Sequence, residues 1–204
     1  MIIGISGLKQ SGKDTVGAMI NYLTNNKFEL KMFAQKPKEI VSLLTGCNIR
    51  DLENDEFKNK LIEGIWGDLT YRQLLQKVGT DFGRDMIQPN IWVDDIMKDY
   101  KMQYISGGIG MFHDPRPHYK PIGFPNWIIT DVRFINEIEA IKRNKGIIIK
   151  VTRTDNSKFE DLHKSENELV DYDKFDYIIS NDGTLDELTE KIKKILKTEK
   201  IIKV

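Results

Sequence analysis

The sequence predicts an α/β fold in which five parallel strands form a doubly wound sheet with helices on both faces. Two observations lead to this fold class. Five short apolar runs alternate with stretches of helical periodicity, which is the pattern of repeated strand–helix units. The first run is followed by a glycine-rich turn and an amphipathic helix. Because 204 residues suffice for one domain with a sizeable core, we expect a single domain over 1–204.

The composition limits the classes of partner. Lys plus Arg number 31 and Asp plus Glu also number 31, so no whole-molecule field favours nucleic acid or an acidic membrane surface. Cys47 is the only cysteine, which excludes an internal disulfide and a cysteine-based zinc site. Because the sequence has no signal-peptide pattern and no apolar run long enough to span a bilayer, we expect a cytoplasmic protein without nucleic-acid or membrane partners.

The turn that follows the first expected strand, 2–5, has the features of a phosphate-binding loop. Gly7 and Gly12 free the backbone to turn tightly and to direct successive N–H groups into one concavity, where the positive end of the next helix adds to the attraction for phosphate. Lys13 is placed to reach the β- and γ-phosphates of a nucleotide. An accidental glycine-rich turn is the alternative, but the glycine spacing and the lysine favour a phosphate site.

The residues after the lysine indicate how a metal ion would bind. Asp14 stands where Ser or Thr is usual, so Thr15, one place later, is the hydroxyl available to Mg²⁺. The sequence therefore predicts ATP with Mg²⁺ at this loop. The residues expected to bind ATP here are Gly7, Lys9, Gln10, Ser11, Gly12, Lys13, Asp14 and Thr15.

A second strand and helix follow the first. The apolar segment 28–33 is the expected strand, and Pro37 opens a helical pattern that Gly46 ends. Residues 48–64 are charged and only weakly periodic. They indicate a mobile helical segment, with an ordinary solvated surface as the alternative.

The stretch 70–84 is expected to be a helix with one apolar and one polar side. Arg72, Gln76 and Thr80 recur at four-residue spacing, which stacks them on one helical face. A face of guanidinium, amide and hydroxyl can hold a phosphate and the edge of a base, although such a face is more often simply solvated.

A further helix and a long insert come next. Trp92 begins a helical pattern after Pro89, and we expect 48–103 to form a helical acceptor-binding region. The segment 104–125 is rich in glycine and proline, and is expected to be an irregular insert that acts as a lid or specificity element. The polar residues His113, Asp114 and His118 match no metal-site spacing, so a surface loop is favoured there.

The run 127–130 is expected to be a buried parallel strand, with Asp131 and Arg133 at its carboxyl end. Ligands bind at the carboxyl ends of strands in open α/β sheets, so an acid and an arginine together indicate a site. The alternative is an N-cap aspartate beside a surface arginine. Glu137, on the following helix, is placed to orient Arg133 or a substrate hydroxyl.

The last two expected strands are 147–151 and 177–179. The first of them leads to Arg153, which opens a polar, charged stretch. After the second, Thr184 and Glu187 form a capping box for a final helix with an apolar stripe. These strands complete the predicted sheet.

These motifs, taken in order, resemble the phage-type deoxynucleoside monophosphate kinases of the P-loop nucleoside monophosphate kinase superfamily. The similarity covers nearly the whole chain apart from 104–125. It is carried by 7–15, 72–84, Trp92, 130–137, Arg153, 163–166 and 181–183. The resemblance implies a P-loop nucleotide kinase fold that transfers the γ-phosphoryl group of ATP to a deoxynucleoside monophosphate (dNMP), giving dNDP and ADP as a source of DNA precursors. It also implies the host cytoplasm if the chain is phage-encoded.

The resemblance also implies roles for particular residues. Asp14 or Asp131 would hold a metal-bound water, and Arg153 would close over the γ-phosphoryl group from a lid-like segment at 153–170. Asn181 and Gly183 would border the adenine and complete the ATP site. The implied acceptor residues are Arg72, Gln76, Gly79, Thr80, Arg84, Trp92, Asp131, Arg133 and Glu137. The implied catalytic residues are Lys13, Asp14, Asp131, Arg133 and Arg153.

The lysine and arginines among these residues suit a phosphate acceptor. An anionic acceptor needs positioning and charge neutralisation more than it needs a general base.

Two alternative functions stay open. One is a kinase of another small phosphorylated metabolite, of the phosphomevalonate or dephospho-coenzyme A type. The other is a nucleotide-binding ATPase switch, whose turnover would not depend on any monophosphate. The sequence does not show which bases the enzyme accepts or whether it excludes ribonucleotides. It also leaves the oligomeric state open, and a homodimer is one possibility.

Overall fold

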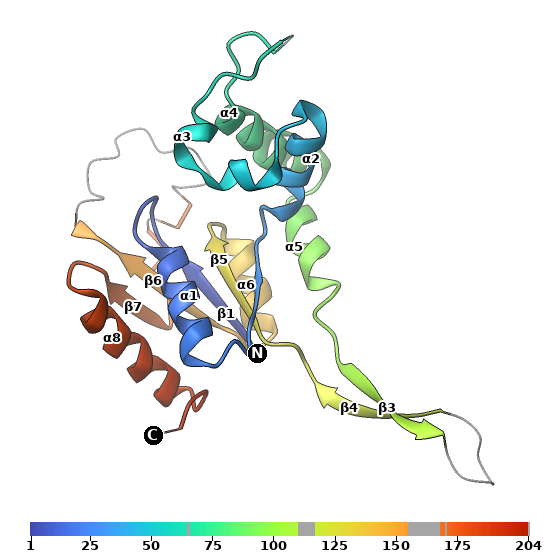
Figure 1. The fold of residues 1–204 in the computed structure, drawn as a ribbon, viewed down its shortest axis with the longest axis vertical. Coiled ribbons are helices and arrows are strands. Elements are labelled where there is room, and N and C mark those ends of the chain that lie inside the picture. Colours follow the sequence, from blue (N-terminus) through green and yellow to red (C-terminus); the bar gives the residue numbers. More distant parts are fainter. Residues whose placement is uncertain (65, 110–116, 155–167, 170, 204) are drawn as a thin grey trace.

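A five-stranded parallel sheet forms the centre of the computed structural model, which describes residues 1–64, 66–109, 117–154, 168–169 and 171–203 (Figure 1). Its strand order is β2-β5-β1-β6-β7, and every neighbouring pair is parallel. The strands are β1 (Ile2–Ser6), β2 (Glu29–Lys31), β5 (Trp127–Val132), β6 (Ile147–Thr152) and β7 (Tyr177–Ser180). All five expected strands are present, so the predicted fold class is confirmed.

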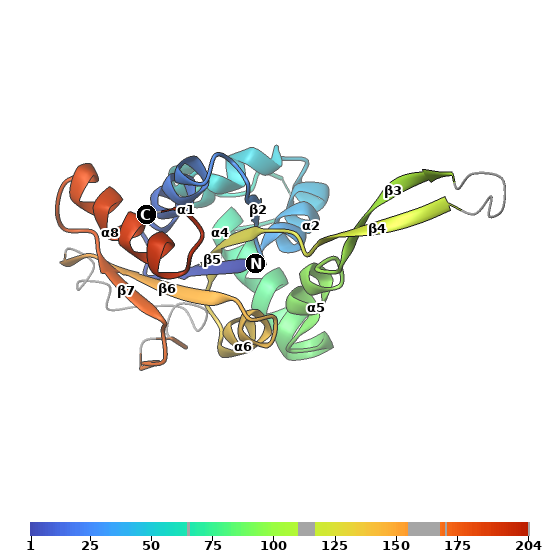
Figure 2. The same ribbon diagram turned by 90° about the horizontal axis from the view of Figure 1, so that it is seen from below.

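Helices cover both faces of the sheet, as Figure 2 shows. The helices α1 (Lys13–Leu23) and α8 (Leu185–Thr198) pack with Ile3 and Ile5 of β1. The helix α6 (Ile135–Arg143) packs with Ile2, on the opposite face of the same strand, and α5 (Ile91–Met97) adds Val93 to that cluster. Successive residues of a strand point to opposite faces, so an unbroken apolar run fills both layers.

The final helix begins at the expected capping box. The backbone N–H of Thr184 donates to Glu187 Oε2 at 2.9 Å, and the N–H of Glu187 donates to Thr184 Oγ1 at 3.2 Å. Two backbone donors that the helix cannot satisfy are thereby paired. None of the helices in the described part of the chain combines the length and hydropathy needed to cross a bilayer.

A helical lobe stands over the carboxyl ends of the strands (Figure 1). It has its own apolar cluster, which includes Val41, Leu52 and Leu74. Its elements are α2 (Gln35–Thr45), η1 (Ile49–Glu53), α3 (Asp55–Lys58), α4 (Tyr71–Gln76) and η2 (Lys77–Ile87). The lobe and the sheet therefore have separate cores that meet at the strand ends.

The insert expected to be irregular instead forms a two-stranded arm over its described residues. The strands β3 (Gln103–Ile109) and β4 (Pro117–Gly123) pair antiparallel and project from the body (Figure 1). The prediction was wrong because glycine and proline were taken as breakers. A two-stranded ribbon has only edge strands, which tolerate proline, and the β-favouring Tyr104 and Ile105 lie among these residues. His113 and Asp114 lie outside the described residues.

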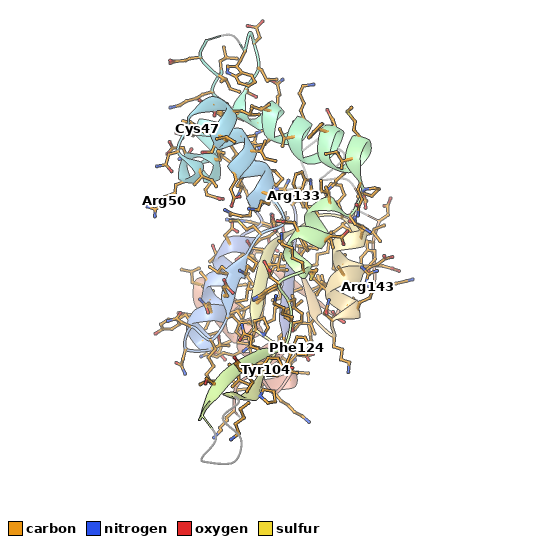
Figure 3. The ribbon with its side chains drawn as sticks, turned by 90° about the vertical axis from the view of Figure 1, so that its right-hand side faces the viewer. Cys47, Arg50, Tyr104, Phe124, Arg133 and Arg143 are labelled. Carbon is orange, nitrogen blue, oxygen red and sulfur yellow. The ribbon has the colours of Figure 1, made fainter. Side chains whose placement is uncertain are left out.

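The base of the arm is anchored on the sheet by aromatic rings. Phe124, labelled with Tyr104 in Figure 3, stacks on Tyr100 with ring centroids 5.3 Å apart. Tyr100 in turn meets the buried Trp127 edge-on at 4.9 Å. These contacts fix where the arm leaves the body.

Candidate active site

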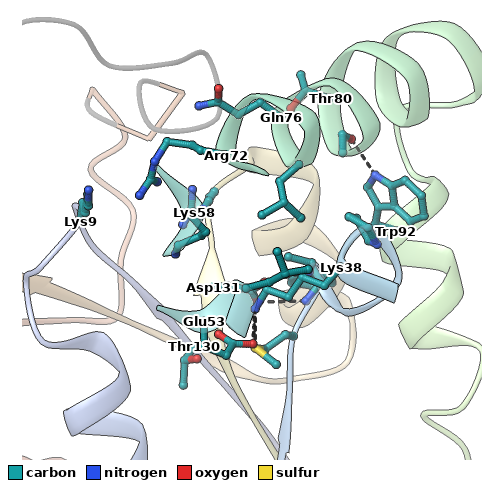
Figure 4. Close-up of a pocket in the computed structure, with 18 of the residues that line it drawn as sticks. Lys9, Lys38, Glu53, Lys58, Arg72, Gln76, Thr80, Trp92, Thr130 and Asp131 are labelled. Atoms are coloured by element: carbon teal, nitrogen blue, oxygen red, sulfur yellow. Dashed lines mark hydrogen bonds and ion pairs between the residues drawn. The ribbon is translucent and has the colours of Figure 1, made fainter. Parts of the chain in front are cut away.

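A cavity of about 270 Å³ lies between the glycine-rich loop, the carboxyl end of β5 and the helical lobe (Figure 4). Segments far apart in the sequence therefore share one space. The predicted site residues that line it are Lys9, Gln10, Lys13, Asp14, Arg72, Gln76, Gly79, Thr80, Arg84, Trp92, Asp131, Arg133 and Glu137. The remaining predicted residues Gly7, Ser11, Gly12, Thr15, Arg153, Asn181 and Gly183 do not line it.

The glycine-rich loop precedes α1 and carries Ser11 and Lys13. The hydroxyl of Ser11 is completely buried inside it and has no hydrogen-bond partner among the residues that the structure describes. The Lys13 ammonium folds back over the loop and donates to the Leu8 carbonyl at 2.8 Å. Because a buried hydroxyl is costly to leave unpaired, and α1 directs its N-terminus at this loop, the residues fit an anion here. Thr15 is exposed at the first turn of α1.

Gly12 must be glycine for two separate reasons. Its φ of +93° lies in the left-handed region, which disfavours residues with a Cβ atom. A Cβ there would also stand 2.3 Å from Asn181 Nδ2. That amide is held in place because it donates to the Ser11 carbonyl at 2.9 Å. Asn181, expected beside the adenine, thus braces the phosphate loop.

Replacing Gly12 by Ala should therefore lower both stability and ATP affinity. We expect a loss of about 1–2 kcal/mol in the free energy of unfolding from backbone strain alone, with ATP affinity reduced by displacement of the loop. Urea unfolding and ATP titration measure the two effects. Gly46→Ala is the matched control, because Gly46 has φ +73° but no atom within 4 Å of its added Cβ. Unchanged ATP affinity in Gly12→Ala would show that the loop does not bind the nucleotide.

The polar face expected on 70–84 lines the cavity, but not as one α-helix. The α-helix ends at Gln76 and continues as a π-helix from Lys77 to Ile87. Trp92 packs so closely on this π-helix that a Cβ on Gly83 would lie 2.4 Å from its ring, and its Nε1 donates to the Gly79 carbonyl at 2.7 Å. Trp92, implied as an acceptor residue, is therefore a buried ring that supports the cavity wall.

A buried ion pair joins the lobe to the sheet domain. Arg84 Nη2 donates to Glu137 Oε1, and both side chains are more than 90 % buried. The other carboxylate oxygen of Glu137 accepts from the backbone N–H groups of Arg133, at 2.6 Å, and Phe134, at 3.1 Å. Burial raises the pKa of Glu137 to about 7, against the opposing effect of the Arg84 guanidinium. Glu137 was expected to orient Arg133 or a substrate hydroxyl; its described contacts are the backbone N–H of Arg133, that of Phe134 and the Arg84 guanidinium.

Asp131 links β5 to the start of α2. One of its carboxylate oxygens accepts from the N–H of Phe33 and the other from that of Ala34, both at 2.9 Å. Ala34 is the N-cap of α2, so the aspartate caps a helix distant in sequence rather than the one that follows it. Arg133 lies at the junction of the lobe and the sheet (Figure 3).

Arg153, expected in the lid, and Asn181 and Gly183, expected beside the adenine, do not line the cavity. Arg153 is exposed, and the segment expected to be a lid falls mostly outside the described residues, as do His163, Ser165 and Glu166. Gly183 lies against Glu187 of the capping box.

Sequence reasoning missed a cluster in the charged stretch 48–64. Asp55 and Lys58 line the cavity beside Lys9 and Arg72. The available signal was weak: Asn54 caps α3, and Asp55 and Lys58 stand three residues apart on it. Such pairs are frequent on solvated helices, so the pattern alone does not indicate a site.

Comparisons with known proteins give one consistent result. A family model described as deoxynucleotide monophosphate kinase matches residues 38–192. A putative deoxynucleotide monophosphate kinase of Acanthamoeba polyphaga mimivirus is 29 % identical over 196 residues, which is 94 % of each chain. The deoxynucleotide monophosphate kinase of Enterobacteria phage T4 is 30 % identical over 176 residues, or 85 % of this chain and 62 % of that protein. That of Escherichia phage RB69 is 29 % identical over 76 % of this chain and 57 % of its own length, so the match spans under two thirds of both phage proteins.

Proposed function

Because the chain belongs to the deoxynucleotide monophosphate kinase family, we propose that it transfers the γ-phosphoryl group of ATP to a deoxynucleoside monophosphate, giving dNDP and ADP. The observation that carries this proposal is the shared cavity. The glycine-rich loop contributes Lys9, Gln10 and Lys13 to this cavity, and Arg72 lies on the wall that the helical lobe contributes. Such an enzyme is a phosphotransferase with nucleotide substrates, and these substrates favour a cytoplasmic location, the host cytoplasm if a phage carries the gene.

The proposed reaction needs little proton transfer. An oxygen of the acceptor phosphate attacks the γ-phosphorus in line, the bond from that phosphorus to the β,γ-bridging oxygen breaks, and ADP leaves with that oxygen. Lys13, at the start of α1, would neutralise charge on the transferring group. Arg133 would grip phosphate from the strand end, while Arg72, Gln76 and Thr80 would hold the acceptor on the facing wall.

Mg²⁺ is proposed at the hydroxyl of Thr15, a residue that is exposed at the helix start. When bound, the ion would supply charge neutralisation on the β- and γ-phosphates. Asp131 already gives both oxygens to backbone N–H groups, so Asp14 is the better candidate to hold a metal-bound water.

A substitution at Arg133 tests the strand-end role. Arg133→Lys keeps the charge but loses the planar fork that binds phosphate through two parallel hydrogen bonds, so kcat should fall about a hundredfold. Steady-state kinetics with ATP and a dNMP measure this change. Arg143→Lys, an exposed position on α6, is the matched control and should leave kcat unchanged. Equal kcat values for the two variants would show that Arg133 does not bind the phosphate during the reaction and has a structural role.

Product analysis tests the reaction itself. The protein is incubated with ATP, Mg²⁺ and one candidate acceptor, and the nucleotides are separated by anion exchange. We expect a deoxynucleoside diphosphate to accumulate in equal amount with ADP. A phosphorylated product formed only from another small phosphate, such as phosphomevalonate or dephospho-coenzyme A, would contradict the proposed acceptor class.

A further inference from the structure

Three cations from separate parts of the chain converge on a single carboxylate, that of Asp55. Arg72 Nη2 lies 2.8 Å from Asp55 Oδ1, and Lys58 Nζ lies 3.0 Å from the same oxygen. Lys9 Nζ, from the phosphate loop, lies 3.7 Å from Oδ2. All four residues line the cavity, and Figure 4 shows Lys9, Lys58 and Arg72 gathered at one side of it.

The cluster holds more positive than negative charge. One carboxylate faces three cations, and Arg72 is oriented further because its Nε donates to Asn59 Oδ1 at 2.8 Å. Burial of Asp55 works against ionisation, but Arg72, Lys58 and Lys9 outweigh it and lower its pKa to about 2. Asp55 therefore stays an anion at every physiological pH, and the side chains of the cluster are 20–39 % exposed, so a second anion can reach them.

We infer that Lys9, Lys58 and Arg72 form the site for the acceptor's phosphate, and that Asp55 is an internal anion that occupies this site until the phosphate binds. This inference rests on the proposed function for the identity of the ligand. Lys9 makes the longest of the three contacts with Asp55. Asp55 thereby joins the phosphate loop to the lobe in the empty enzyme, and keeps the cations from repelling one another.

Removing the internal anion should strengthen phosphate binding. The phosphate loop is first filled with a non-hydrolysable ATP analogue, and inorganic phosphate is then titrated calorimetrically. We expect Asp55→Asn to bind phosphate about tenfold more tightly, because a like charge a few ångströms away in a half-exposed site is lost. Its melting temperature should be lower without phosphate and recover when phosphate is added. Glu56→Gln is the matched control, since it removes an exposed acid from the same first turn of α3.

A second variant keeps the test decisive if Asp55→Asn does not fold. Lys58→Gln should weaken phosphate binding severalfold, whereas Lys60→Gln, an exposed lysine two residues further along, should not change it. Phosphate affinity that is unchanged or weaker in Asp55→Asn, or unchanged in Lys58→Gln, would overturn the inference.

This inference and the proposed function can fail separately, because phosphate binding is measured without turnover. An enzyme that phosphorylates dNMP but lacks these effects refutes only this inference. Failure to bind the ATP analogue or to phosphorylate any dNMP refutes the proposed function instead.

Discussion

Lys13→Ala is expected to lower turnover about a thousandfold while the protein stays folded, which corresponds to a loss of roughly 4 kcal/mol of transition-state stabilisation. In the proposed reaction the Lys13 ammonium, which donates to the Leu8 carbonyl of the loop, neutralises charge on the transferring phosphoryl group. Lys13 lies at the surface of the cavity rather than in an apolar cluster, so its loss removes little packing. Steady-state kinetics and a thermal unfolding curve measure the two quantities on the same sample.

The control for this substitution is Lys27→Ala. Lys27 is exposed beyond the far end of α1, and its loss should change neither quantity. Retention of most turnover in Lys13→Ala would remove the phosphate loop from the mechanism. A large fall in melting temperature would instead assign Lys13 a structural role.

The largest loss of stability is expected from Glu137→Leu. The substitution leaves the Arg84 guanidinium buried without its carboxylate and deprives two backbone N–H groups of their acceptor. Breaking a buried pair from one side costs about 3–5 kcal/mol, because the remaining charge is desolvated and unpaired. Urea unfolding measures the change in the free energy of unfolding. Glu139→Gln, at an exposed position of the same helix, should stay within about 0.5 kcal/mol of the original protein.

A double substitution separates the cost of the unpaired charge from the value of the pair. In Arg84→Met with Glu137→Leu no charge is left buried, so much of the lost stability should return. If Glu137→Leu alone costs less than about 1 kcal/mol, the pair does not hold the lobe on the sheet domain. If the double variant is no more stable than Glu137→Leu, the loss comes from the orphaned backbone donors.

The sheet could be predicted because its signal is local. Strands buried on both faces read as unbroken apolar runs, and each of the five runs is a strand of the sheet. The phosphate loop is local too, since its glycines, lysine and following helix lie within a few residues of one another. The capping box of the last helix was predictable for the same reason.

Pairs that depend on tertiary contact could not be predicted. Arg84 and Glu137 lie 53 residues apart, and nothing in either local pattern says that they meet. Asp131 lines the cavity, but nothing near it in the sequence indicates that its oxygens also hold the start of a helix almost a hundred residues earlier. The π-helix was missed because its polar residues keep a four-residue spacing, which is also the spacing of an α-helix.

The arm was mispredicted because local breakers were given too much weight. Its strands stabilise each other by pairing, which glycine and proline at ribbon edges do not prevent. The Asp55 cluster was missed for the opposite reason: its charges look like ordinary surface until the lobe folds over the loop.

The most direct test of the central claim is ADP release from ATP and Mg²⁺, coupled to an optical assay, with dTMP, dGMP, dCMP, dAMP and their ribose counterparts added one at a time. We expect release that depends on at least one deoxynucleoside monophosphate, and the rates with the different acceptors then give the base and sugar selectivity. ADP release at the same rate with and without every acceptor would show that the chain is not a deoxynucleoside monophosphate kinase. The chain would then be a nucleotide-dependent switch, and the wall at Arg72 and Gln76 would not be an acceptor site.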